Sequence, residues 1–307
     1  MIKHKFFLFL LFCVSTAVNS QTVKLVVPFS AGGIVDRVAR GIEKTLANKL
    51  PYNFTVEYQP GAAGVIAANN VAKNHSKETV LLVHSSAIAT NTFNPNSTYD
   101  LVKDFVPVAR LGSVPTVLVI NQQTGISNIK KLKQFDSPIF YAATGLGSTG
   151  HVAGELLKNA IDKDLIPVFY KGESNALADV LSNNVPMMFV SAGVVTGYIS
   201  STQIAIIAIA GTQRNIAFPD VPTFGEQGIR GFDRSPNWIV VLANTGADPV
   251  VITNVKNAIA QSFDTPQDQE LYRRAGIEPN AQPLANIREF LLEEVERVRP
   301  FRAKLKE

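Results

Sequence analysis

Residues 24–40 read KLVVPFSAGGIVDRVAR, and the interpretation of the whole chain starts from them. Residues 25–27 form a short apolar run typical of a buried strand, and Pro28 ends it. The glycine pair at 32–33 forms a flexible loop, and helical spacing begins at Ile34. A strand, a glycine loop and a helix in this order aim backbone N–H groups and the positive end of a helix dipole at an anion. This stretch therefore predicts an anion-binding loop.

A second loop of this kind follows about a hundred residues later, at 145–150 (GLGSTG). It matches G-x-G-x-x-G, but a dinucleotide site needs an acidic residue at the end of the next strand. Here the next strand ends in Tyr170-Lys171-Gly172, while Asp162 and Asp164 precede it. The loop is instead predicted to seat a small anion, and we expect the two loops to face each other across a cleft.

The 307 residues, 46% hydrophobic and 18% charged, suffice for two α/β domains. Residues 1–20 have a basic start, an apolar run and a small-residue end, which predicts a signal peptide cleaved near Ser20 and an exported protein. The single cysteine, Cys13, lies inside it, so lipidation is the alternative. Removing this segment lowers the formal net charge from +4 to +2, and the chain has no dense basic patch with interleaved aromatic residues. Nucleic acid is therefore not an expected partner.

Alternating strand and helix patterns occur twice along the chain. In the first hundred residues they run β-α-β-α-β, which predicts a parallel sheet whose strand ends place residues 29–33, 60–64 and 85–87 along one rim. The pattern starts again after residue 121, and a late strand at 238–242 with C-terminal helices returns to the first domain. We predict domain 1 at 21–121, domain 2 at 122–236 and the return at 237–307, with two hinge crossings.

The mature chain offers little for catalysis or for a metal. Ser148 and His151 resemble a nucleophile and its base, but the G-x-S-x-G elbow is absent, and a capping or cleft-lining role suits His151 better. The three remaining histidines have no metal-ligand spacing. We expect no enzyme activity, no cofactor and no metal.

Several motifs in order resemble the Bug/TctC family, the extracytoplasmic solute receptors of tripartite tricarboxylate transporters. The resemblance covers essentially the whole mature chain and rests on these segments: VPFSAGGIVDRVAR (27–40), QPGAAG (59–64), KDFVPVARLG (103–112), ATGLGSTGHVAGELL (143–157), PVFYKGESNALADVL (167–181) and PDVPTFGEQGIRGF (219–232). It implies an α/β, type II periplasmic-binding-protein fold that closes like a clamshell on one small carboxylate.

The resemblance also implies which residues bind the ligand. In the first domain they are Phe29, Ser30, Ala31, Gly32, Gly33, Asp36, Gly61, Ala62, Gly64, Ser85, Ser86 and Ala87. In the second domain they are Thr144, Gly145, Gly147, Ser148, His151, Tyr170, Lys171 and Asp179. Tyr58-Gln59 replaces the family's more common Asn-Arg or Asn-Lys pair, which favours a monocarboxylate over a di- or tricarboxylate. A β-branched residue at Gly33 is expected to abolish binding, through its bulk or through a positive φ there.

The function predicted on this basis is capture of a small organic carboxylate and its delivery, by a monomer, to membrane subunits of a tripartite tricarboxylate-type transporter. The alternatives are an orphan receptor that feeds a signalling system, and a secreted hydrolase. The sequence does not name the acid, because recognition by backbone groups leaves little side-chain signature.

Overall fold

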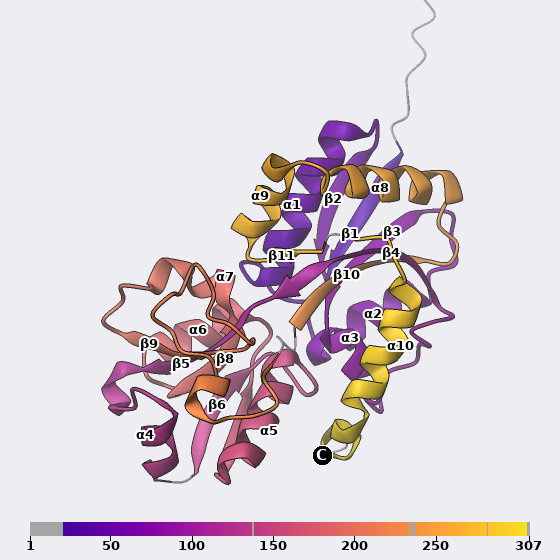
Figure 1. Cartoon of the computed structure of the whole chain (residues 1–307). Coiled ribbons are helices and arrows are strands. Elements are labelled where there is room, and N and C mark those ends of the chain that lie inside the picture. The colour runs from indigo at the N-terminus through magenta and orange to yellow at the C-terminus, as the bar shows by residue number, and fades with distance from the viewer. Residues whose placement is uncertain (1–20, 137, 234–236, 281, 306–307) are drawn as a thin grey trace, which may run out of the picture.

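The structure is a computed structural model that describes residues 21–305 apart from 137, 234–236 and 281. The predicted signal peptide and Cys13 lie outside the described residues. Two α/β units lie one above the other (Figure 1), each built on one sheet. The prediction of two α/β domains is therefore confirmed.

The first sheet is six-stranded, in the order β11-β4-β10-β3-β1-β2. Its strands are β1 (Thr22–Val27), β2 (Asn53–Tyr58), β3 (Thr79–Ser85), β4 (Phe105–Val114), β10 (Asn237–Asn244) and β11 (Glu278–Pro279). Its helices are α1 (Ile34–Lys49), α2 (Val65–Ala72), α3 (Ala87–Asn91), α8 (Pro249–Gln261), α9 (Pro266–Ala275) and α10 (Ile287–Val298). β1, β2 and β3 pair in parallel as predicted, but β10 is antiparallel to β3 and β4, so the sheet as a whole is mixed.

The second sheet is five-stranded, in the order β7-β6-β8-β5-β9. Its strands are β5 (Thr116–Asn121), β6 (Ile139–Ala143), β7 (Leu165–Phe169), β8 (Met187–Ser191) and β9 (Ile204–Ile209). Its helices are α4 (Ile129–Gln134), α5 (Thr149–Ile161), α6 (Glu173–Leu181) and α7 (Ala192–Val195). Short 3₁₀ turns cover Ala62–Gly64, Gln122–Thr124, Thr196–Tyr198, Gly225–Gln227 and Arg299–Leu305.

The chain crosses twice between the two sheets. β5 follows β4 directly and joins the second sheet antiparallel to β8 and β9, whereas β10 returns into the first sheet between β3 and β4. The first change of sheet therefore falls at Pro115, before the predicted boundary at 121. The sequence alone places the crossing between the domains at the polar connector after β5, because a single proline between two strands does not have the composition of a loop.

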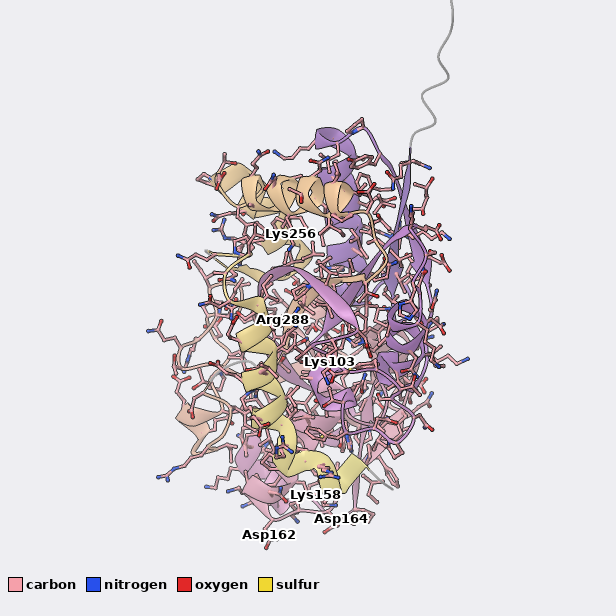
Figure 2. All side chains as sticks on the ribbon, turned by 90° about the vertical axis from the view of Figure 1, so that its right-hand side faces the viewer. Lys103, Lys158, Asp162, Asp164, Lys256 and Arg288 are labelled. Atoms are coloured by element: carbon pink, nitrogen blue, oxygen red, sulfur yellow. The ribbon has the colours of Figure 1, made fainter. Side chains whose placement is uncertain are left out.

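Several elements differ from the sequence prediction, among them β4, α6 and the C-terminal helix. β4 was not predicted, since Pro107, Arg110 and Gly112 interrupt its apolar pattern. The sequence pattern predicts a helix at 176–181, and α6 begins three residues earlier, at Glu173. The predicted helix at 284–306 is α10 followed by a 3₁₀ turn. Figure 2 shows Arg288 of α10 beside Lys103 of the first domain, and the Arg288 guanidinium donates to the Val102 carbonyl at 2.6 Å.

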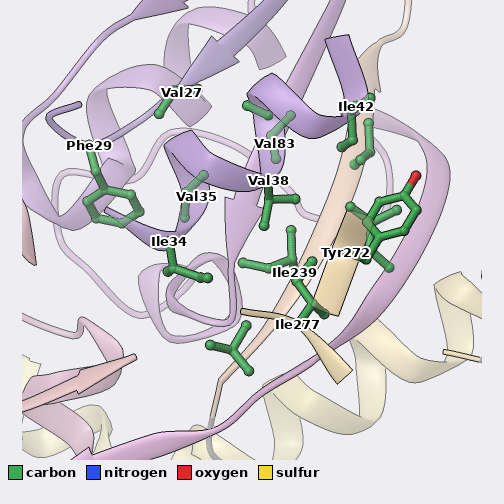
Figure 3. Close-up of a cluster of buried hydrophobic side chains, with 14 of the residues drawn as sticks. Val27, Phe29, Ile34, Val35, Val38, Ile42, Val83, Ile239, Tyr272 and Ile277 are labelled. Carbon is green, nitrogen blue, oxygen red and sulfur yellow. The ribbon is translucent and has the colours of Figure 1, made fainter. Parts of the chain in front are cut away.

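Both faces of the first sheet are covered by helices. In β10, Ile239 and Val241 face the helix α1 side, while Trp238 and Val240 face α2 and α10. Figure 3 shows the α1 side, where one apolar face of α1 packs on β1, β3 and β10. Full burial of each aliphatic side chain stabilises the fold by about 1.5–3 kcal/mol. This packing fixes the start of α1 at the edge of the sheet.

Candidate functional site

The loops that follow β1, β2 and β3 lie along one edge of the first sheet. These strands are neighbours and run in parallel, so their carboxyl ends meet at the same edge. The predicted common rim for residues 29–33, 60–64 and 85–87 is therefore confirmed by the strand pairing.

The Asp36 carboxylate, on the first turn of α1, stabilises the loop at 29–33. It is buried, its Oδ2 accepts from the Gly32 backbone at 2.7 Å, and its Oδ1 accepts from Arg40 at 3.0 Å and from the Tyr58 hydroxyl at 2.7 Å. The positive φ of the loop lies at Gly32 (+87°), whereas Gly33 has φ −77°. The expectation of a positive φ at Gly33 was therefore wrong, and Gly32 is the residue whose conformation favours glycine.

The second loop has four successive residues with positive φ: Gly61 (137°), Ala62 (48°), Ala63 (53°) and Gly64 (96°). The two alanines each cost of order 1 kcal/mol or more in this conformation, so surrounding contacts must hold them. The buried Asn91 amide donates to the Ala63 carbonyl at 2.9 Å. Gly64 lies against the His84 ring, where a Cβ would come within 2.3 Å of Nε2. Glycine is required there by both space and φ.

His84 is buried in β3, beneath these two loops. Its ring meets Phe29 of the first loop edge to face, with 5.7 Å between ring centroids. Burial lowers the pKa of His84 to about 4, since the charged ring would have to lose its water.

In the second domain, Ser148 and His151 build the start of α5. The Ser148 hydroxyl accepts from the His151 backbone at 3.3 Å, and His151 Nδ1 accepts from the Gly147 backbone at 3.1 Å. Both side chains are buried. The arrangement is that of a helix cap, as the capping interpretation of His151 supposes.

Tyr170 and Asp179 face each other. The Tyr170 hydroxyl donates to Asp179 at 2.7 Å, and Asn184 also reaches this carboxylate at 3.3 Å. Burial, together with the Asp179 carboxylate, raises the pKa of Tyr170 to about 12. The pair therefore stiffens the second-domain wall, and the structure turns Asp179 toward Tyr170.

Several hydrogen bonds join the two rims directly, among them one from the Ser30 hydroxyl to the Lys171 carbonyl at 3.3 Å. The Ser30 backbone donates to the Lys171 carbonyl at 3.2 Å, the Ser86 and Thr149 hydroxyls lie 3.0 Å apart, and the Ile34 backbone donates to Glu173 Oε2 at 3.1 Å. Gly145 also approaches the second loop, since a Cβ there would lie 2.9 Å from the Ala63 nitrogen. The two domains are thus in contact across the cleft.

A cavity of about 30 Å³ lies between the rims, which is room for one or two water molecules. Four of the predicted residues line it: Phe29, Gly33, Ser85 and Thr144. Thr149 and Gly150 belong to the loop at 145–150 that was predicted to seat an anion, whereas sequence reasoning missed the others: Ile34, Val35, Ala143, Glu173, Met188, Phe189 and Asn237. Glu173 had a usable signal, because an acidic residue directly after a glycine marks a first helical turn.

The remaining predicted residues are not among those that line the cavity. Ala31, Ala62 and Lys171 are exposed on the rims, and Ala87 begins α3. A larger groove of about 690 Å³ opens on the hinge side, between β4, α10 and the loop after β9. It contains none of the predicted rim loops, so the small cavity between the rims is the candidate site.

Two features are absent from the part of the chain that the structure describes. In it, no His, Cys, Asp or Glu side chains gather in threes as a metal site would require. No helix there is long and apolar enough to cross a membrane.

Two α/β domains joined by two chain crossings, with facing rims of loops, define a two-domain solute-binding protein. The chain belongs to the tripartite tricarboxylate transporter receptor family, TctC, whose model matches residues 38–306. BugT of Bordetella pertussis is 31% identical over 300 residues, which cover 94% of this chain and 91% of BugT. The predicted membership of the Bug/TctC family is thus confirmed.

Solved structures confirm the predicted fold. The periplasmic binding protein BugD has a TM-score of 0.84 and 26% identity, covering 93% of this chain and 97% of BugD. MatC of Rhodopseudomonas palustris with bound malate has a TM-score of 0.83, 25% identity and coverage of 92% and 99%. A protein of the same organism with adipate has a TM-score of 0.85, 25% identity and coverage of 94% and 98%.

Proposed function

We propose that this protein is a periplasmic receptor that captures a small organic carboxylate between its two domains and delivers it to a transporter of the tripartite tricarboxylate type. The observation that carries the proposal is the set of contacts between the rims, Ser30–Lys171, Ser86–Thr149 and Ile34–Glu173, around a small cavity. Such contacts suit a clamshell that opens to admit a solute and closes to exclude water. The malate and adipate held by the two R. palustris proteins support an acid as the ligand.

The binding groups are the loop residues predicted from the sequence, acting through backbone N–H groups and hydroxyls. Capture requires no chemical step. The cavity between the rims is too small for a dicarboxylic acid in the closed arrangement, so the ligand enters only after the rims separate. Domain opening about the two crossings, at Pro115 and before Asn237, supplies that movement.

Location and partner follow from the same family membership. The signal-peptide pattern at 1–20 and the periplasmic homologue BugD support export to the periplasm. The family is named for its transporter, and we infer that the closed form presents a surface that the membrane subunits recognise, with the receptor acting as a monomer.

A thermal-shift screen tests this function. Residues 21–307 are purified, unfolded and refolded to remove carried-over ligand, then screened against mono-, di- and tricarboxylates, aromatic acids and amino acids. A ligand at a hundred times its Kd adds about 2.7 kcal/mol to the free energy of unfolding, which shifts the melting temperature measurably. Stabilisation confined to one class of acid supports the proposal, and no shift across the panel contradicts it. Ester turnover that disappears in Ser148→Ala would also contradict it, in favour of a hydrolase.

A further inference from the structure

The start of α1 already holds a carboxylate of the protein itself. Gly33 has no side chain with which to cap this sixteen-residue helix, and the first helical N–H group, that of Ile34, donates to Glu173 Oε2 at 3.1 Å. Glu173 belongs to the second domain, so the bond crosses the cleft. The position at which the first loop was predicted to seat a ligand anion is thus occupied by an anionic side chain.

The other oxygen of Glu173 is also held. Oε1 accepts from the Ser191 backbone at 2.9 Å and from the Ser191 hydroxyl at 2.7 Å. Ser191 is buried, and the Asn237 amide approaches its hydroxyl at 3.3 Å. Three donors therefore fix the direction of this carboxylate, which makes Glu173 a built feature of the cavity wall.

Other amides of the first loop have acceptors within the protein as well. The Ser30 N–H group donates to the Lys171 carbonyl and the Gly32 N–H group donates to Asp36. Among the described residues that line the cavity, Glu173 is the one with a charged side chain. A ligand carboxylate on this side would face a like charge where little water remains to screen it.

A second part of the cavity lining, the start of α5, has a different character. α5, a thirteen-residue helix, begins there with Thr149 and Gly150, and the Thr149 hydroxyl lies 3.0 Å from the Ser86 hydroxyl. The positive end of this helix dipole and two hydroxyl groups suit a carboxylate. The cavity therefore has one wall that suits an anion and one wall that suits a cation.

We propose that Glu173 determines the ligand specificity of the cleft and selects a carboxylic acid that also carries a cationic nitrogen, an amino acid or a betaine. The nitrogen lies against Glu173 and the carboxylate against the start of α5, while dicarboxylic acids are rejected by Glu173. The inference rests on the proposed receptor function and adds the class of ligand. It sets this chain apart from the malate- and adipate-bound relatives, whose ligands are dicarboxylic acids.

The test uses acids matched in skeleton and measures affinity for residues 21–307 by calorimetry. One set is succinate, 3-aminopropanoate and propanoate, and another is adipate, 5-aminopentanoate and pentanoate; the common α-amino acids and glycine betaine complete the panel. Glu173→Gln removes the charge with little change of shape, and Glu289→Gln removes the same charge from the exposed face of α10 as a control.

We expect the wild-type protein to bind an amino- or trimethylammonium-bearing acid at least tenfold more tightly than the dicarboxylate of matched skeleton. Glu173→Gln should reduce this ratio at least tenfold, and Glu289→Gln should leave it unchanged. A dicarboxylate that binds the wild-type protein as tightly as its amino counterpart overturns this inference and leaves the receptor function standing. Binding of no acid at all overturns both. The ranking by the wild-type protein decides the question even if Glu173→Gln does not fold.

Discussion

The buried His84 makes the stability of this protein depend on pH in a predictable way. Its pKa is about 4 in the folded chain because burial opposes the charged ring, whereas an unfolded histidine titrates near 6.5. Between these two values the unfolded chain binds a proton that the folded chain does not. The free energy of unfolding therefore falls as the pH falls through the window from about 6.5 to 4.

The size of the effect follows from the two pKa values. Between pH 7 and pH 5 the linkage relation gives a loss of about 2 kcal/mol from this one residue. Because His84 packs against Gly64 and Phe29, protonation of its ring should also disturb the two first-domain loops that line the cleft.

Urea unfolding at pH 7 and pH 5 measures this contribution. The wild-type protein includes other titrating groups, so the quantity of interest is its difference from His84→Gln, which carries no titrating ring. His84→Gln should have a lower free energy of unfolding than the wild type at pH 7. Between pH 7 and pH 5 its free energy of unfolding should fall by about 2 kcal/mol less than that of the wild type. His75→Gln, at an exposed position, is the control for removal of one histidine. An equal pH dependence in wild type and His84→Gln would refute the reasoning.

Three further predictions concern closure and packing. Gly172→Ala places a Cβ 2.9 Å from the Ser30 Cβ across the cleft, and its φ of −177° is one that any residue adopts, so the change opposes domain closure without straining the backbone. It should weaken ligand binding, measured by calorimetry, about tenfold, whereas Gly197→Ala, where a Cβ meets open space, should leave binding unchanged. Gly33→Val should reduce ligand binding, because its Cβ lies 3.6 Å from Glu173, and unchanged affinity would contradict a role for this loop. The free energy of unfolding measured in urea should change by less than about 1 kcal/mol, because the φ of −77° at this position is allowed for valine. Asn244→Ala leaves the Val80 amide and three backbone carbonyls without their hydrogen-bond partner and should lower the free energy of unfolding by roughly 3 kcal/mol. An equal decrease in Asn257→Ala, at an exposed position, would contradict this prediction.

Much of this protein can be read from local sequence. The apolar run that ends at Pro28 predicts β1, the apolar run at 80–83 predicts β3, and the spacing after Gly33 predicts α1, because these patterns depend on residues close together in the chain. The parallel order of the first strands then follows from the β-α-β-α-β succession. It brings the glycine loops to one edge without further information.

Only the tertiary structure decided which groups meet in the cleft. The sequence predicts that the start of α1 binds a ligand anion, but Glu173, 139 residues away, accepts a hydrogen bond from Ile34 there. The family resemblance places Asp179 among the ligand-binding residues, but in the structure its carboxylate faces Tyr170. The antiparallel partners of β5, which are β8 and β9, come later in the chain, so the local sequence around β5 does not show that this strand joins the second sheet. Local patterns fix which residues form helices, strands and loops. Contacts between distant segments depend on how two separately packed domains close, and no local pattern records that geometry.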